Sequence, residues 1–354
     1  MSLFAGCGGS SLGYRAAGYD VRLAVDWDPK AAACYRANFP GTPFWEGDVA
    51  RLSGGEALRL AGVAPGGLDV LDGSPPCQGF STAGKRRFAD ARNGLFREFA
   101  RLLGAFRPRA FVMENVSGLR KGKMRLAFAE MTVALKGAGY RVSCRELNAW
   151  WWGVPQDRRR LVWVGVREGL GVTPSHPAPT ARRPVSVAEA LGLEVAAMES
   201  HPGYRDARWR GVCPTLGAGR RPALSAGLWN DMAGNRPRPL SLPSATLMAA
   251  RPPMFRGRSR PAADWASAIA GDDIKSWQAK KLDVSRPSFT QIGSQRNWHP
   301  IEARPIMVAE AKILQGFPES FQVSEYRLIG NSVPPPMAEA VGRHVAALLG
   351  RAAP

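Results

Sequence analysis

Near its start the chain reads LFAGCGGSSLG, residues 3–13: a short apolar entry, a cluster of glycines and then a helical pattern. Glycine lets the backbone turn sharply and approach a ligand, and the helix that follows points free amide donors at that ligand. Asp26 follows Gly6 by 20 positions, directly after the apolar run 21–25. A carboxylate there can accept hydrogen bonds from both hydroxyls of a ribose. A dinucleotide and S-adenosylmethionine both suit this pattern, and the spacing GxGG rather than GxGxxG favours the latter.

From this turn onward, short apolar runs alternate with helical patterns as far as residue 168. We expect strands at 21–25, 68–71, 110–113, 140–145 and 161–166, and helices at 10–17, 29–38, 94–106 and 124–137. Such alternation predicts a doubly wound, Rossmann-like α/β sheet with a largely parallel core. Helical patterns return at 307–315 and 336–349.

The middle of the chain has a different composition. Residues 171–300 are rich in Pro, Gly, Ser and Arg, and residues 201–260 hold 11 Lys and Arg against 2 Asp and Glu. Apolar residues such as Trp209, Trp229 and Phe255 are frequent enough to anchor a fold. We therefore expect a smaller, irregular, basic second domain rather than a disordered linker.

The charge of the 354-residue chain points to its partner. A formal net charge of +19 and a pI near 10.6 favour a polyanion. We find no apolar run of ~18 residues that could span a bilayer, and the first residues do not resemble a signal peptide. These features predict a cytoplasmic protein that binds nucleic acid and no membrane.

The five cysteines are scattered and form no CxxC pair, which argues against a disulfide framework and against a zinc site. No metal is expected. Cys77 stands apart because GSPPCQGFS, residues 73–81, places two prolines before it and Gly79 after it. The prolines restrict the backbone, so this thiol is held rigidly after an apolar run.

Two further stretches suit chemistry beside that thiol. RAFVMENVSGL, residues 109–119, ends an apolar run in Glu114 and Asn115, so a carboxylic acid could meet the cysteine across one substrate. GVPQDRRRLVWVGV, residues 153–166, places Arg158 and Arg160 on the same side of an extended segment. These arginines either form structural salt bridges or aim donors at an oxygen beside the thiol.

Taken together, these stretches resemble the cytosine-5 DNA methyltransferase family, of prokaryotic or phage type, over nearly the whole chain. LFAGCGG and DWD match its cofactor motifs, GSPPCQGFS its nucleophile loop, ENV its acid strand and QDRRR its paired arginines. EAKILQGFP at 310–318 and GNSVPPPMAEAVG at 330–342 match its two closing motifs, in the family's order. Ser2, Met307 and Ala309 depart from residues that are common in the family.

The resemblance implies a role for each matching position. Cys77 would be the nucleophile, Glu114 would engage the cytosine ring, and Arg158 and Arg160 would hold base and thiolate. S-adenosyl-L-methionine would be the cofactor and S-adenosyl-L-homocysteine the product. The implied cofactor residues are Phe4, Gly6, Gly8, Gly9, Asp26, Trp27, Asp48, Pro76, Asn331 and Val333.

The resemblance also implies how the chain is divided and how it binds double-stranded DNA. Residues 1–178 and 325–354 would form the catalytic domain, 179–300 the target-recognition domain and 301–324 a hinge. The loop 81–97 would fold over the DNA. The implied DNA contacts are Gln78, Ser81, Lys85, Arg86, Arg87 and Arg92. The expected enzyme is a monomeric DNA (cytosine-5-)-methyltransferase that flips its target base.

Three other functions agree less well with the sequence. A tRNA cytosine-5 methyltransferase would carry a shorter second domain with a Cys-Phe-Thr segment, which we do not find. A catalytically inactive DNA-binding homologue would show damage at the thiol, acid or arginine positions, which are intact. An NAD-dependent oxidoreductase would explain only the glycine turn. The recognised DNA sequence and a cognate restriction endonuclease cannot be read from this chain.

Overall fold

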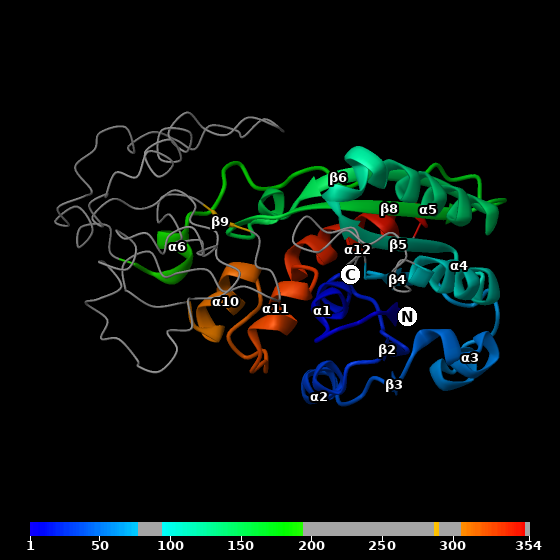
Figure 1. Cartoon of the computed structure of the whole chain (residues 1–354), viewed down its shortest axis with the longest axis horizontal. Helices are drawn as coiled ribbons and strands as arrows, with labels where there is room; N and C mark the ends of the chain where they lie inside the picture. Colours follow the sequence, from blue (N-terminus) through cyan, green and yellow to red (C-terminus); the bar gives the residue numbers. More distant parts are fainter. Residues whose placement is uncertain (77–93, 194–286, 290–305, 351–354) are drawn as a thin grey trace.

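A seven-stranded sheet forms the centre of the computed structural model, which describes residues 1–76, 94–193, 287–289 and 306–350 (Figure 1). Its strand order is β3-β2-β1-β4-β5-β8-β6. The strands are β1 (Ser2–Leu3), β2 (Ala24–Asp26), β3 (Phe44–Glu46), β4 (Val70–Gly73), β5 (Ala110–Val116), β6 (Tyr140–Asn148) and β8 (Arg159–Arg167). β1 to β5 pair in parallel, whereas β8 runs antiparallel to both of its neighbours.

Helices cover both faces of this sheet. α3 (Gly54–Ala61), α4 (Leu95–Phe106) and α5 (Arg125–Gly137) pack on one face, and α1 (Gly9–Ala16) and α12 (Pro335–Leu348) on the other. α2 (Pro29–Asn38), α6 (Val187–Leu191), α10 (Val308–Gln315) and α11 (Tyr326–Asn331) contribute to a third apolar cluster. The sheet is therefore enclosed as expected for a doubly wound fold.

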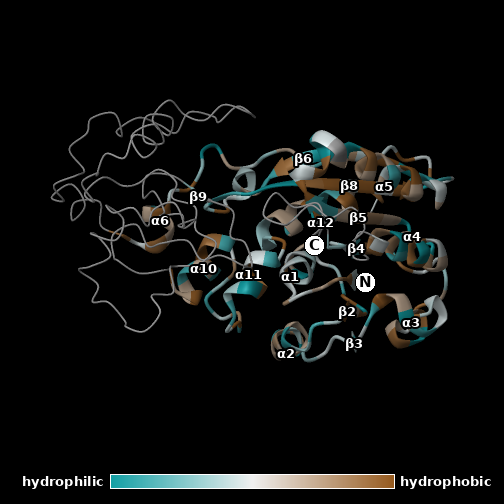
Figure 2. Cartoon of the chain, in the orientation of Figure 1, coloured by the Kyte–Doolittle hydropathy of each residue, from teal (hydrophilic) through white to brown (hydrophobic). Residues whose placement is uncertain are grey.

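Alternation along the central strands explains why both faces are apolar. On β5, Phe111 and Met113 face the α4 and α5 side, while Ala110 and Val112 face α12. The central strands are correspondingly rich in apolar residues, most clearly along β8 (Figure 2), as buried strands with helices on both sides require. The Phe111 ring meets Phe99 of α4 edge-on, with centroids 5.9 Å apart. Each such buried aromatic side chain contributes about 2–3 kcal/mol.

The C-terminal helix returns to the first helix. α12 packs so closely on α1 that a Cβ on Gly13 would lie 2.4 Å from the carbonyl oxygen of Pro335. The Tyr19 hydroxyl donates to the carbonyl oxygen of Gly342 at 3.0 Å. Residues more than 300 positions apart thus complete one layer of the fold.

The structure confirms the predicted α/β class with its mostly parallel sheet. The periodicity did not predict the helices α3, α6 and α11. A short parallel pair joins β7 (Gln156–Asp157) to β9 (Ser288–Phe289). Most of the predicted target-recognition domain lies outside the described residues, as does part of the hinge. Within the described residues, no helix is long and apolar enough to cross a membrane.

Candidate active site

The carboxyl ends of the parallel strands bring the predicted site residues to one edge of the sheet. Residues 4–9 follow β1, Asp26 ends β2, Asp48 follows β3, residues 74–76 follow β4, and Glu114 lies near the end of β5. Open α/β sheets bind their ligands at this edge. These residues span more than 100 positions of the sequence, from residue 4 to Glu114, and the sheet brings them to one edge.

The glycine turn is tied directly to Asp26. The amide of Gly6 donates to Oδ2 of Asp26 at 2.8 Å, and the amide of Asp28 donates to Oδ1 at 3.0 Å. Burial raises the pKa of this carboxyl, although both amide hydrogen bonds oppose the shift. Gly8 has φ +98°, and a Cβ there would lie 2.3 Å from the Phe39 ring, so the turn needs glycine at this position.

Aromatic and acidic side chains flank Asp26. Trp27 is 72% exposed, so its indole is free to stack on a planar group. Phe4, half-buried, has a positive φ of 56°. Asp48 is exposed and caps its own short helix by accepting from the amide of Ala50 at 3.0 Å. A carboxylate for a ribose beside exposed aromatic surface fits the nucleoside part of S-adenosylmethionine.

The second closing motif lies against the glycine turn. A Cβ on Gly9 would lie 2.3 Å from the carbonyl oxygen of Val333, so the two segments are in close contact. Asn331 ends α11 with its side chain exposed, whereas Val333 is buried. Asn331 and Val333 therefore lie beside the expected cofactor site.

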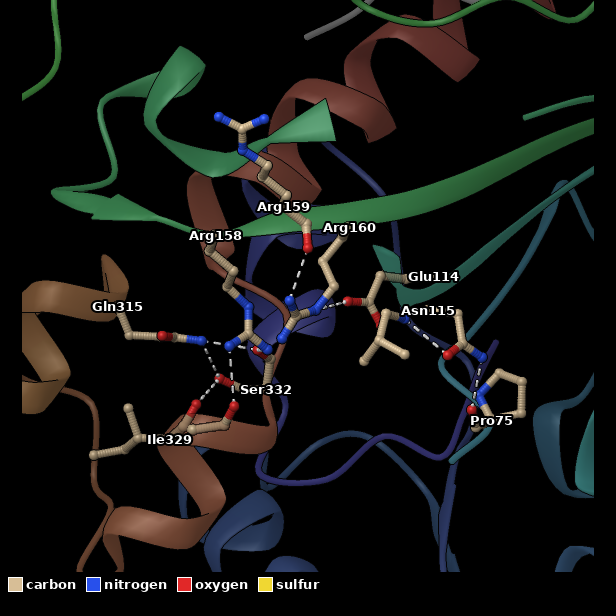
Figure 3. A network of polar contacts seen from close by, with 11 residues as sticks. Pro75, Glu114, Asn115, Arg158, Arg159, Arg160, Gln315, Ile329 and Ser332 are labelled. Carbon is tan, nitrogen blue, oxygen red and sulfur yellow. Dashed lines mark hydrogen bonds and ion pairs between the residues drawn. The ribbon is translucent and has the colours of Figure 1, made fainter. Parts of the chain in front are cut away.

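Glu114 forms an ion pair with Arg160, with Oε1 and Nε 2.8 Å apart (Figure 3). The register explains the contact: Glu114 lies opposite Val162 and Arg160 opposite Val116, so the acid and the arginine are diagonal neighbours on one face of the sheet. Both side chains are nearly buried. Burial lowers the pKa of the Arg160 guanidinium, while the charge of Glu114 raises it.

Arg158 lies on the same side of the strand as Arg160, and Arg159 points away (Figure 3). The two terminal nitrogens of Arg158 donate to main-chain carbonyl oxygens, Nη1 to Gly330 at 3.1 Å and Nη2 to Ser332 at 2.9 Å. The side chain is 2% exposed. That Arg158 holds base or thiolate stays a prediction, and these contacts indicate instead a residue that positions the 330–332 segment.

Two buried glutamines, which were not among the predicted site residues, continue this network. Gln156 donates to Oε1 of Gln315 at 2.7 Å and to the carbonyl of Leu314 at 3.1 Å. Gln315 donates in turn to the carbonyl oxygen of Ser332 at 2.8 Å. Both glutamine side chains are fully buried. The usable signal was an uncharged polar residue inside each of the motifs QDRRR and LQGFP.

Asn115, the neighbour of Glu114, anchors the segment before the predicted nucleophile. Its Nδ2 donates to the carbonyl oxygen of Pro75 at 3.1 Å, and its Oδ1 accepts from the amide of Val116 at 2.8 Å. The residues that the structure describes stop at Pro76 and resume at Gly94. Cys77 and the predicted DNA contacts Gln78, Ser81, Lys85, Arg86, Arg87 and Arg92 lie outside the described residues.

Among the described residues, no group of three or more His, Cys, Asp or Glu side chains could hold a metal ion. The thiols of Cys7, Cys34 and Cys144 are free.

Comparisons with known proteins agree with the motifs. The model of the C-5 cytosine-specific DNA methylase family matches residues 1–210 and 238–347. Type II methyltransferase M.XorII of Xanthomonas oryzae pv. oryzae is 36% identical, covering 98% of this chain and 84% of the relative. Type II methyltransferase M1.HphI of Haemophilus parahaemolyticus is 33% identical, covering 98% and 86%.

A solved structure agrees as well. The crystal structure of an E. coli prophage-encoded protein, described as a DNA modification methyltransferase, is 26% identical. It superposes with a TM-score of 0.67 over 99% of both chains. The chain therefore belongs to the C-5 cytosine-specific DNA methylase family.

Proposed function

We propose that this DNA cytosine-5-methyltransferase acts through a covalent bond between the Cys77 sulfur and carbon 6 of a cytosine flipped out of the duplex. The observation that carries the proposal is the Glu114–Arg160 ion pair, joined through Asn115 to the segment that leads into Cys77. An acid, a cation and the approach to a thiol thus share one edge of the sheet.

The residue types match the chemistry of the base. Carbon 5 of cytosine is a weak nucleophile, and attack of a thiolate on carbon 6 makes it an enamine carbon. S-adenosylmethionine supplies the methyl group when it is bound. The carbon 5 proton then leaves to a base, and the electrons of that bond expel the thiolate and break the carbon–sulfur bond. Nearby arginines favour a thiolate by lowering a cysteine pKa.

Glu114 and Arg160 are suited to stabilising the ring during attack. Glu114 in its acid form can donate to ring nitrogen 3, and Arg160 can donate to oxygen 2. In the structure Arg160 already faces the Glu114 carboxylate, and its Nη1 donates to the carbonyl oxygen of Arg159 at 2.8 Å. The ion pair therefore holds both side chains at this edge of the sheet before substrate binds, and Glu114 takes up a proton before it donates to nitrogen 3.

The cofactor would lie across the ends of β1 to β4. Asp26 would accept hydrogen bonds from the ribose, Trp27 and Phe4 would flank the adenine, and Asp48 would accept from the adenine amino group. Gly6, Gly8, Gly9 and Pro76 would let the backbone approach the cofactor, and Asn331 and Val333 would close its methionine end. The two amide hydrogen bonds that orient Asp26 support this assignment.

DNA recognition would come from the basic segment 179–300, carried on the hinge 301–324. A stacked base is inaccessible to a thiol, so the cytosine has to leave the duplex at a cost of a few kcal/mol. Phosphate contacts from basic residues offset that cost. Grafting 179–300 onto a relative's catalytic domain should transfer the recognised sequence. A chimaera that still methylates the recipient's site would show that specificity lies elsewhere.

A duplex that carries 5-fluorocytosine tests the mechanism directly, because fluorine cannot leave as a proton. The parent enzyme should form an adduct that survives a denaturing gel, only when S-adenosylmethionine is present. Cys77→Ser should form none while still binding duplex, and Cys144→Ser serves as the matched control. Bisulfite sequencing identifies the methylated base, and methylation of tRNA but not of duplex DNA would overturn the proposal.

A further inference from the structure

Directly after the acid strand, the chain carries a run of positive charge that the proposed mechanism does not use. Residues 115–129 include Arg120, Lys121, Lys123 and Arg125 and no acidic residue. The run begins six positions after Glu114, so it lies within about 20 Å of chain from the acid. Its charge is therefore concentrated at the edge of the sheet where substrate is expected.

Buried residues fix the backbone of this run to the core. Leu119 and Met124 are both buried in the apolar cluster beneath α4 and α5. Two short 3-10 helices, η3 (Ser117–Arg120) and η4 (Gly122–Met124), hold the backbone between them. Arg120, Lys121 and Arg125 are exposed around these two anchors. The charges are thus presented from a defined surface rather than from an extended loop.

The positive charges are not neutralised within the described part of the chain. Neither Arg120, Lys121 nor Arg125 has an acidic partner within 4 Å among the described residues. Neighbouring arginines differ: Arg97 pairs with Glu130, and Arg101 pairs with Glu98 at 2.7 Å. An exposed basic cluster without acidic partners attracts polyanions.

We infer that Arg120, Lys121 and Arg125 bind the phosphate backbone of the DNA that flanks the flipped cytosine. The inference rests on the proposed function, because a cytosine that meets Glu114 brings its flanking phosphates to this edge. Exposed lysine and arginine side chains on a fixed backbone suit phosphates, which carry no sequence information. The surface adds affinity for any duplex and fixes the position of the duplex against the sheet.

The test is an Arg120→Ala, Lys121→Ala, Arg125→Ala triple variant of the full chain. A matched control replaces Arg59, Lys136 and Arg141, three exposed basic residues whose elements lie at the opposite edge: Arg59 and Lys136 in the last turns of α3 and α5, and Arg141 at the start of β6. Both variants lose the same charge. Duplex affinity is measured at several salt concentrations, with S-adenosylmethionine affinity measured in parallel.

The triple variant should bind specific and non-specific duplexes about tenfold more weakly, with the salt slope reduced by about 0.9 for each lost phosphate contact. Cofactor affinity should not change, and the control should keep the slope of the parent. Equal slopes for the two variants, or a loss confined to one sequence, would overturn the inference. If the parent methylates no duplex, the proposed function fails. If the parent methylates duplex DNA but its salt slope equals that of the triple variant, only the inference about this surface is refuted.

Discussion

The side-chain amide of Asn115 donates to the carbonyl oxygen of Pro75, 3.1 Å away, and so joins β5 to the residue two positions before Cys77. Both groups are buried. The same strand carries Glu114 on to its ion pair with Arg160. The end of β5 therefore holds the acid and also contacts the segment that leads into the predicted nucleophile.

Asn115→Asp should lower the rate of methyl transfer about 10- to 100-fold, because a carboxylate cannot donate to the Pro75 carbonyl and a displacement of about 1 Å can cost a rate factor of that size. The carboxylate can still accept from the Val116 amide. Single-turnover transfer of a labelled methyl group measures the rate. Cofactor affinity should stay at the parent's value, and a rate within twofold of the parent would contradict the positioning role.

Arg158→Lys should destabilise the protein and weaken cofactor binding, although it keeps the charge. A lysine cannot donate to both the Gly330 and Ser332 carbonyls in the fixed geometry of a guanidinium. Leaving a buried carbonyl without its donor costs about 1–3 kcal/mol. Chemical denaturation and calorimetric titration of S-adenosylmethionine measure the two effects.

Arg159→Lys is the matched control, since Arg159 points to the other side of the strand and is about one-third exposed. It should leave stability and cofactor affinity close to those of the parent. If Arg158→Lys instead lowers only the rate of the chemical step, Arg158 contacts the reacting groups and the positioning role is wrong.

Gly9→Ala should raise the cofactor dissociation constant at least tenfold. The new Cβ would lie 2.3 Å from the Val333 carbonyl oxygen, so either the glycine turn or the 331–333 segment must shift. Gly104→Ala is the control: it lies within α4 with open space around its Cβ, and alanine should stabilise that helix by up to about 1 kcal/mol. Calorimetry gives the cofactor affinities, and equal affinities in both variants would show that the close contact is not needed.

Much of the site could be predicted because its residues sit where strands end. Apolar runs followed by Asp26 and Glu114 located two carboxylates, and the sheet places both at the carboxyl edge. The alternation that revealed β5 also determined which face each side chain takes. A site residue that directly follows an apolar run can therefore be predicted from the sequence, because the run marks the strand and its end marks the edge of the sheet.

Other features have no local signal. α3 begins with two glycines, which disfavour a helix, and it is held by the Ser53 hydroxyl, which accepts from the amide of Glu56 at 3.1 Å. The contacts of Arg158 reach carbonyls more than 170 positions away, so only the folded chain reveals them. The antiparallel direction of β8 likewise becomes visible only in its pairing with β5 and β6.

Asp26 should make cofactor binding and stability respond to pH in opposite directions. Burial raises its pKa above that of an ordinary aspartate, so the folded state binds this proton more tightly than the unfolded state. The contribution to folding stability is then greatest below the unfolded pKa and decreases as pH rises through the folded pKa. Accepting from ribose hydroxyls requires the ionised form, so cofactor affinity should fall as pH is lowered through the same range. Asp26→Asn should lack both responses, and calorimetric titration with parallel denaturation from about pH 7.5 to about pH 4.5, a range that extends towards the ordinary aspartate pKa, measures them. A parent-to-variant affinity ratio that stays constant over this range would remove Asp26 from the ribose site.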